Sequence, residues 1–228
     1  MTLKLYYDLL SQPSRAVYIF LKAAKVPFEP KDVPLRKNAH FTDDFKQISR
    51  FNLVPAIEHD GFKLVESVAI LRYLVRAGQV ADHWFPKDSR KQAKVDEYLA
   101  WQHHNTRFLC NFYFQRKYLT PIRTGVPMKE EHIQDSEDRL VGCLEKIENM
   151  WLDKQKFLAG DDITVADILA ACELEQTRIA GFDPRDGFPK IRSWLDAVRD
   201  RLNPHYDEAH SVVYRLIEKN QVNSSKST

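Results

Sequence analysis

One short stretch, residues 9–15 (LLSQPSR), limits the fold of this chain more than any other part of the sequence. The residues before it, LKLYY at 3–7, alternate in the manner of a short buried strand, and those after it carry apolar side chains at helical spacing. Pro13 suits the first turn of such a helix, because its missing N–H would have no partner there. The sequence therefore predicts a strand followed at once by an amphipathic helix, with Ser11 in the turn between them.

The predicted place of Ser11 also suits the binding of an anion. The first amides of a helix have no partner within the helix, and the helix dipole places partial positive charge at the same end. A thiolate would be stabilised there. The simpler interpretation is that Ser11 or Gln12 only caps the helix. These residues alone leave both interpretations open.

The first 77 residues or so are predicted to follow the order β-α-β-α-β-β-α. A helical crossover makes the first two strands parallel neighbours. The last two strands form an antiparallel hairpin, because Asp60-Gly61 suits a type I′ turn. Mixed strands with helices between them predict an α/β domain. The predicted strands are residues 3–7, 27–33, 52–58 and 63–65, and the predicted helices follow Ser11, span residues 42–49 and open at Glu66-Ser67.

After Asp88 the sequence has no strand pattern and predicts helices alone. Thr164 is a credible N-cap of one of them, with Asp167 reaching back from the first turn. Residues 78–87 are predicted to be a linker between the two halves, and residues 220–228 a polar tail. The predicted helices cover residues 88–118, 128–154, the stretch from 163 onwards, 189–202 and 204–218.

The composition is that of an ordinary globular protein, with 228 residues, of which 43% are hydrophobic and 29% are charged. A net charge of +2 is too small to indicate nucleic acid or an anionic membrane as a partner. The chain opens without a charged leader and apolar core, and no apolar stretch reaches the ~18 to 20 residues of a membrane span. We therefore expect a cytoplasmic protein that binds neither nucleic acid nor membrane.

The three cysteines, Cys110, Cys143 and Cys172, lie far apart, and no C-x-x-C pair occurs. This spacing argues against a zinc ribbon, a redox dithiol or a disulfide framework, and it favours a reducing compartment. His103 and His104 are adjacent rather than four residues apart, so they lack the spacing of a metal-binding pair on a helix. We expect no metal site.

These features together resemble the cytosolic glutathione transferases over nearly the whole chain. The string SQPSRAVYIF at residues 11–20 is similar to the theta class in particular, in which a serine replaces the catalytic tyrosine of many other classes. Val54-Pro55, Glu66-Ser67 and the capping box of Thr164 and Asp167 stand in the same order and spacing. The resemblance implies a thioredoxin-like N-terminal domain that binds glutathione (residues 1–77) and an all-α domain that supplies the electrophile site (residues 88–219).

The resemblance implies an enzyme that adds the glutathione thiolate to small electrophiles such as alkyl halides and epoxides, with reduction of organic peroxides as a further activity. Ser11 would hold the thiolate through its hydroxyl. Lowering a thiol pKa by about two units takes about 2.7 kcal/mol of preferential thiolate binding. A hydrogen bond to charged sulfur (~1.5 to 3 kcal/mol) and a helix N-terminus (~0.5 to 1 kcal/mol) suffice. The alternative is a non-catalytic scaffold or ligand-binding protein of the same fold, and the presence of Ser11 favours catalysis.

The resemblance also implies where glutathione binds. A cis bond between Val54 and Pro55 would open the Val54 backbone to the cysteinyl backbone of glutathione. The helix opened by Glu66 and Ser67 would hold the γ-glutamyl end, and His40 matches the position that reaches the glycyl carboxylate. Ordinary caps, a trans proline and an exposed loop histidine are the alternatives. The predicted glutathione-binding residues are Gln12, His40, Leu53, Val54, Pro55, Glu66, Ser67, His104 and Arg107.

One polar stripe and several aromatic residues extend this prediction into the second half. His104, Arg107 and Asn111 would share one face of the predicted long helix. Arg107 matches a basic position of the theta class, whereas His104 stands where an acidic residue is expected. Core packing is the alternative for the aromatic residues of the pocket. The predicted electrophile pocket comprises Leu9, Leu10, Phe108, Phe112 and Tyr113.

The resemblance finally implies a homodimer, with the first domain of one subunit against the helical domain of the other. The chain ends soon after its last predicted helix, whereas some theta members carry a further segment over the pocket. We therefore expect an electrophile site that is more open than theirs.

Overall fold

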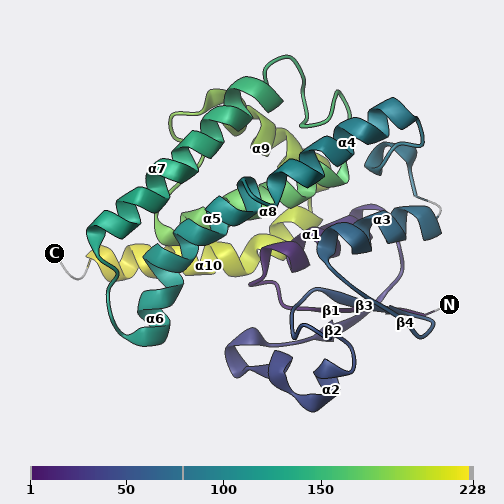
Figure 1. Ribbon diagram of the computed structural model, residues 1–228, viewed down its shortest axis with the longest axis horizontal. Coiled ribbons are helices and arrows are strands. Elements are labelled where there is room, and N and C mark those ends of the chain that lie inside the picture. The colour runs from purple at the N-terminus through teal and green to yellow at the C-terminus, as the bar shows by residue number, and fades with distance from the viewer. Residues whose placement is uncertain (1, 79, 226–228) are drawn as a thin grey trace.

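A mixed four-stranded sheet organises the first part of the structure, which is a computed structural model that describes residues 2–78 and 80–225 (Figure 1). The strands are β1 (Leu3–Tyr7), β2 (Glu29–Asp32), β3 (Ala56–His59) and β4 (Phe62–Val65). Their order in the sheet is β2-β1-β3-β4. Strand β1 pairs parallel with β2 and antiparallel with β3, and β3 pairs antiparallel with β4. The predicted parallel pair and antiparallel hairpin are both confirmed.

Three helices accompany this sheet, namely α1 (Gln12–Ala23), α2 (Asp43–Lys46) and α3 (Ser67–Ala77). Helices α1 and α3 lie between the sheet and the helical half, and α2 lies on the opposite side of the sheet (Figure 1). Between β3 and β4, Asp60 and Gly61 have φ angles of +49° and +86°, as a type I′ turn requires. The observed element order is therefore the predicted β-α-β-α-β-β-α.

The second half consists of helices joined by loops, and no strand occurs among its described residues. Its helices are α4 (Ser89–Gln102), α5 (Thr106–Phe114), α6 (Thr120–Thr124), α7 (Glu130–Lys146), α8 (Val165–Thr177), α9 (Pro189–Leu202) and α10 (His205–Ser225). The predicted capping box is confirmed at the start of α8. There the Thr164 hydroxyl accepts from the Ala166 amide at 3.2 Å, and the Asp167 carboxylate accepts from the Thr164 amide at 2.8 Å.

The prediction of one long helix over residues 88–118 is wrong, because a break at residues 103–105 separates α4 from α5. Asn105 has φ −118° and ψ −99°, and its side-chain amide donates to the carbonyl of Trp101 at 2.8 Å. This bond competes with a continuing helix, within a run of weak helix formers, HHNT. His104 and Arg107 therefore do not share one helical face.

Helix α10 continues beyond residue 218, where the sequence predicted its end, and includes residues 220–225 of the predicted polar tail. The side-chain amide of Asn220 donates to the carbonyl of Ile179 at 2.9 Å. This bond attaches the extended part of the helix to the helical half. Residues 226–228 of the predicted tail lie outside the described residues.

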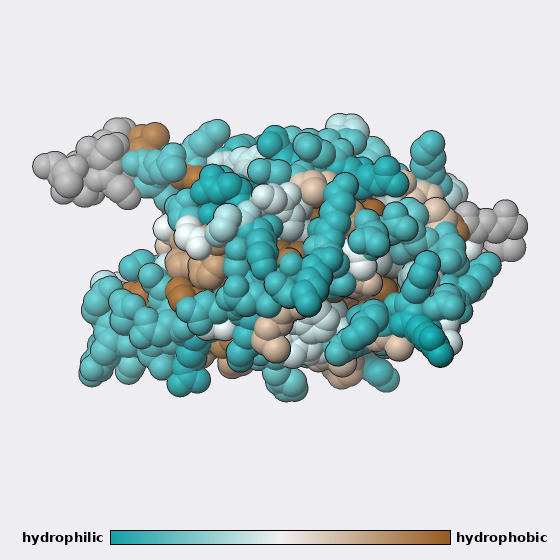
Figure 2. Space-filling view, turned by 90° about the horizontal axis from the view of Figure 1, so that it is seen from above, coloured by the Kyte–Doolittle hydropathy of each residue, from teal (hydrophilic) through white to brown (hydrophobic). Residues whose placement is uncertain are grey.

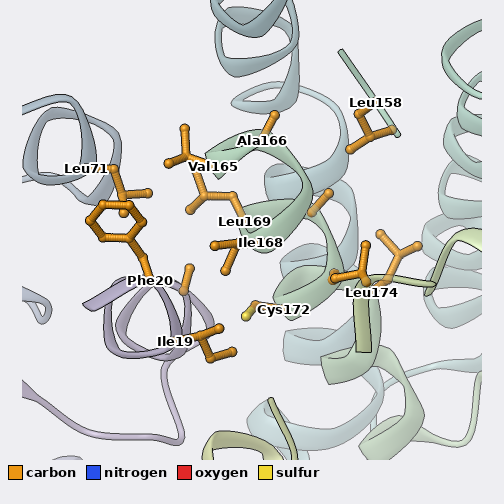
Figure 3. Close-up of a cluster of buried hydrophobic side chains, with 14 of the residues drawn as sticks. Ile19, Phe20, Leu71, Leu158, Val165, Ala166, Ile168, Leu169, Cys172 and Leu174 are labelled. Atoms are coloured by element: carbon orange, nitrogen blue, oxygen red, sulfur yellow. The ribbon is translucent and has the colours of Figure 1, made fainter. Parts of the chain in front are cut away.

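The two halves share a core between α1, α3 and α8 (Figure 3). Ile19 and Phe20 of α1 and Leu71 of α3 lie opposite Ile168 and Cys172 of α8, and none of the five is more than 1% exposed. Burial of a large apolar side chain contributes about 1.5 to 3 kcal/mol. This shared core holds α1, and with it the turn of Ser11, against the helical half.

The outer face of the helical half is mainly hydrophilic, with apolar side chains only in small separate patches (Figure 2). The apolar residues of its helices turn inward instead, as Ile191, Trp194 and Leu195 of α9 do. Among residues 2–78 and 80–225, none of the helices combines the length and the apolar character that crossing a bilayer requires.

Candidate active site

Ser11 lies where β1 gives way to α1, as predicted, and it is half-buried. Its extended backbone (φ −85°, ψ 123°) makes it the N-cap of α1, and its Oγ accepts from the amide of Ser14 at 3.5 Å. Capping uses only the oxygen of the hydroxyl as an acceptor. Its hydrogen donates to no described residue, so it stays available to an anion. Capping and anion binding are therefore compatible at this residue.

Asp8 fixes the turn before Ser11, a role that the sequence analysis missed. Its carboxylate accepts from the amide of Leu10 and from the amide of Leu35, each at 2.8 Å, and its carbonyl accepts from the amide of Ser11 at 2.9 Å. An aspartate two residues before a turn amide is a typical sequence pattern for such a bond. Asp8 thus ties the Ser11 turn to the loop that leads to His40.

The segment around Val54 offers unpaired backbone groups. The Val54-Pro55 bond is cis, as the resemblance implied. Both backbone groups of the preceding Leu53 are bonded to the Ser49 hydroxyl, at 2.9 and 3.2 Å, and its side chain is exposed. The amide and carbonyl of Val54 bond to no residue that the structure describes. They can accept an added strand-like backbone.

Gln12 follows Ser11 in α1, and its side chain is only 6% exposed. The side-chain amide nitrogen is fully enclosed, and no described group accepts a hydrogen bond from it. A buried donor without a hydrogen-bond partner costs about 1 to 3 kcal/mol of stability. The side-chain amide of Gln12 lacks the acceptor that would offset this cost. Because this nitrogen has no exposed surface, both interpretations of Gln12 stay open, a contact with glutathione and the end of the turn.

Glu66 and Ser67 form the start of α3 with an uncommon backbone. Glu66 has φ +72° and ψ +109°, outside the regions that residues with a Cβ usually adopt. Its carbonyl accepts from the amide of Ile70 at 2.8 Å, and no side chain caps the helix. The first amides of α3 are therefore open to an anion, with the exposed Glu66 carboxylate beside them.

His40 lies in a short turn of 3₁₀ helix, Ala39–Phe41, with its ring 3.9 Å from that of Phe41. Burial lowers the pKa of His40, and the nearby Asp8 carboxylate opposes that shift. The Nδ1 atom is enclosed without a described partner. The lowered pKa favours the neutral form of His40, which lies at the end of the loop that Asp8 anchors.

The stripe predicted on the long helix is not continuous. His104 lies in the break, exposed and without a hydrogen bond to any described residue. Arg107, on α5, is half-buried and pairs with both carboxylate oxygens of Glu173 at 3.1 Å. Burial raises the pKa of Glu173, and Arg107 opposes that shift. Arg107 therefore has a fixed internal partner, whereas His104 has none among residues 2–78 and 80–225.

The aromatic residues predicted for the electrophile pocket divide into two groups. Phe108 is 49% exposed, and it stacks on the half-buried Phe112 with ring centres 5.4 Å apart. Tyr113 is only 2% exposed, packs against Phe182 and donates to the carbonyl of Ala180 at 3.4 Å. Tyr113 belongs to the helical core, so the pocket prediction is corrected there.

Leu9 and Leu10, the remaining predicted pocket residues, are half-buried in the turn before Ser11. Three surface hollows of about 260, 380 and 480 Å³ lie elsewhere on the molecule, and none is lined by a predicted site residue. The Ser11 turn is therefore not part of any of these three hollows.

Comparison with known proteins decides the family. Two family models match, described as the N-terminal domain (residues 1–76) and the C-terminal domain (residues 99–201) of glutathione S-transferase. Mouse (Mus musculus) glutathione S-transferase theta-3 is 41% identical over 94% of this chain and 90% of its own length. Human (Homo sapiens) theta-1 is 40% identical over the same shares.

The chain belongs to the theta class of the glutathione S-transferase family. The solved structure of human glutathione S-transferase T1-1 in its apo form superposes with a TM-score of 0.91, at 39% identity over 95% of this chain and 91% of the other. A human theta-class transferase in complex with the glutathione conjugate of 1-menaphthyl sulfate gives 0.91 at 35% identity over 98% and 92%.

As a theta-class glutathione S-transferase, the protein is an enzyme that conjugates glutathione, its co-substrate, to electrophiles. Within the described ranges, no group of three or more histidine, cysteine, aspartate and glutamate side chains is arranged to hold a metal ion. Its thioredoxin-like first half and helical second half are those of the family.

Proposed function

We propose that Ser11 is the residue that stabilises the glutathione thiolate, and that the acceptors of the thiolate are small alkyl halides, epoxides and organic peroxides. The observation that carries this proposal is the free hydroxyl hydrogen of Ser11 at the N-terminus of α1. A hydrogen bond to charged sulfur and the helix dipole together supply about 2 to 4 kcal/mol, enough for a thiol pKa near 7 or below. Ser11 acts as a donor and neither attacks the electrophile nor removes a proton.

Glutathione would lie along the edge that starts at Val54. The open amide and carbonyl of Val54 support pairing with the cysteinyl residue of the tripeptide, between Leu53 and Pro55. The free amides of α3, with Ser67 and Glu66, support binding of the γ-glutamyl carboxylate and ammonium. The other proposed contacts come from Gln12, His40, His104 and Arg107.

We place the electrophile above the turn of Leu9 and Leu10, beside the stacked rings of Phe108 and Phe112. A human theta-class relative holds the glutathione conjugate of 1-menaphthyl sulfate, which makes aromatic sulfate esters a further class to test. Residues 1–77 would thus bind glutathione and residues 88–219 the electrophile, with residues 78–87 as the linker.

We also propose a homodimer and a cytoplasmic location. Phe51 and Phe62, which are 51% and 49% exposed on the first domain, provide apolar surface of the kind that a partner subunit covers. The cysteines Cys110, Cys143 and Cys172 are unpaired and buried, which suits a reducing compartment.

Replacement of Ser11 tests the proposed role directly. We expect Ser11→Ala to raise the pKa of bound glutathione by about one to two units and to lower kcat at neutral pH about tenfold to hundredfold, because a donor to a charged group is lost. The measurements are a spectroscopic titration of the thiolate and turnover of a reactive alkyl halide.

Ser14→Ala is the matched control. It removes the next serine hydroxyl of the same turn, whose oxygen is buried without a described partner, and should leave the thiol pKa unchanged. If the parent turns over none of several electrophiles with glutathione, the chain is instead a scaffold or ligand-binding member of the fold. An Ser11→Ala variant as active as the parent would contradict the role of Ser11.

A further inference from the structure

Arg15, one turn into α1 from Ser11, is a charged residue with no exposed surface. Its Nη1 donates to the carbonyl of Leu9 at 2.8 Å and to that of Leu10 at 3.5 Å. Its Nη2 donates to the carbonyl of Cys172 at 3.0 Å and to the side-chain oxygen of Gln176 at 2.7 Å. One guanidinium therefore joins the turn before Ser11 to helix α8 of the other half.

The burial of this charge is not explained by stability. No carboxylate of the described residues bonds to Arg15, and burial lowers the pKa of Arg15, although Glu173 and Glu175 oppose that shift from a distance. Its Nε has no partner among the described residues. Apolar residues of similar volume often replace buried ions without loss of stability. A buried guanidinium without a carboxylate partner is therefore better explained by a role in positioning the groups that it contacts.

Arg15 bonds to the backbone carbonyls of the turn that precedes Ser11. The carbonyls of Leu9 and Leu10 both turn toward Arg15. The amides on the opposite side of the turn, those of Leu10 and Ser11, both donate to Asp8. The turn is thus held between the Arg15 guanidinium and Asp8, while the hydroxyl hydrogen of Ser11 donates to no described residue. Arg15 therefore contacts the two peptides that directly precede Ser11.

We propose that Arg15 is a positioning residue for catalysis, which clamps the Leu9-Leu10 peptides to Cys172 and Gln176 of α8 and so aims the Ser11 hydroxyl at the glutathione sulfur. The inference rests on the role proposed for Ser11. The clamp crosses from one half of the molecule to the other, and its acceptor Cys172 belongs to the core shared with Ile19 and Phe20 (Figure 3). The helical half then contributes to thiolate formation without touching glutathione.

Arg15→Lys tests the clamp, because lysine keeps the charge but cannot reach four acceptors with one planar fork. We expect the pKa of bound glutathione to rise by about one unit, so that kcat below that pKa falls about tenfold and recovers at high pH. The KM for glutathione should change less than twofold, since Arg15 contacts no part of the proposed glutathione edge.

Arg185→Lys is the control, because Arg185 is another largely buried arginine of the molecule that contacts Glu175 and Asp183 instead of the Ser11 turn. We expect this variant to lower the unfolding midpoint without changing the thiol pKa or its pH profile. An Arg15→Lys variant that behaves in the same way, less stable but with an unchanged thiol pKa, would overturn the inference.

Two further variants keep the test decisive. If Arg15→Lys does not fold, Gln176→Met removes one acceptor from the far end of the clamp, and we expect about a threefold fall in kcat at neutral pH with the same recovery at high pH. An unchanged pH profile in that variant overturns the inference.

Ser11→Ala separates the two proposals. If the pKa of glutathione bound to Ser11→Ala equals that in the parent, the role proposed for Ser11 fails, and the proposed role of Arg15 fails with it. If only Ser11→Ala raises the pKa, the clamp alone fails.

Discussion

At the scale of single residues, the backbone of Glu66 carries the clearest mark of function. Its φ of +72° is unfavourable for any residue with a Cβ, and such strain costs about 1 to 3 kcal/mol. Glycine would adopt this conformation freely. A glutamate in this conformation agrees with the proposed pairing of its carboxylate to the glutathione ammonium.

The variants Glu66→Gly and Glu66→Ala separate the backbone from the side chain. Both lose the carboxylate, and we expect both to raise the KM for glutathione about threefold to tenfold. Only glycine removes the steric strain, so Glu66→Gly should be more stable than Glu66→Ala by about 1 kcal/mol. The measurements are steady-state kinetics and denaturant unfolding. Equal stability of the two variants would show that the backbone is not strained.

The sequence predicted the place of Ser11 correctly, because a strand, a turn and a proline in a first helical turn are all local patterns. It did not predict that Arg15 is fully buried, because an arginine in the first turn of an amphipathic helix is usually exposed. The acceptors of Arg15 on α8 are about 160 residues away along the chain. No local pattern can reveal such contacts.

At the scale of elements, the start of α8 joins three segments through one carboxylate. Asp167, fully buried, accepts from the amide and hydroxyl of Thr164, from the amide of Leu158 and from the indole of Trp194 on α9, at 2.8 to 3.0 Å. The capping box with Thr164 was predictable from the sequence. The contacts with Leu158 and Trp194 depend on how α8 packs.

Asp167→Ala leaves four buried donors without an acceptor. We expect a loss of about 3 to 5 kcal/mol in the free energy of unfolding, measured by denaturant titration. Thr164→Ser keeps the capping hydroxyl and should cost less than about 1 kcal/mol. A loss of no more than about 1 kcal/mol in Asp167→Ala would mean that the carboxylate acts only as a local cap.

At the scale of the whole molecule, Glu175 of α8 ties the helical half together. Its carboxylate, with no exposed surface, pairs with Arg178 at 2.7 Å and with Arg185, and accepts from the hydroxyl of Tyr206 on α10 at 2.9 Å. Burial favours the neutral acid, but the surrounding positive charge outweighs burial and lowers the pKa of Glu175 to about 2. Burial also lowers the pKa of His210 to about 3, so Arg185 and Arg178 supply that charge at neutral pH.

This shift predicts how stability depends on pH. Because the pKa is lower in the folded protein than its ordinary value of 4.5, Glu175 stabilises the fold above pH 4.5, and the contribution is lost as the pH falls toward about 2. We expect Glu175→Gln to lower the free energy of unfolding by about 3 kcal/mol at neutral pH. The difference from the parent should shrink progressively below about pH 4.5.

Denaturant unfolding of both proteins between pH 7 and pH 3 measures this difference. Glu145→Gln, which alters an exposed carboxylate of the same helical half, is the control and should leave the parent profile unchanged. A Glu175→Gln difference that stays constant down to pH 3 would mean that the ion pairs are not the source of the stability.

The sequence alone determined the order of the elements, the hairpin at Asp60-Gly61, the Ser11 turn and the capping box of α8, because each depends on residues close together in the chain. The tertiary structure decided the burial of Tyr113, the backbone of Glu66 and the contacts of Arg15. These features arise from packing between distant segments, whose energies exceed the local preferences of any one residue. The fold was therefore readable from local patterns, whereas the geometry that aims Ser11 depends on helix α8.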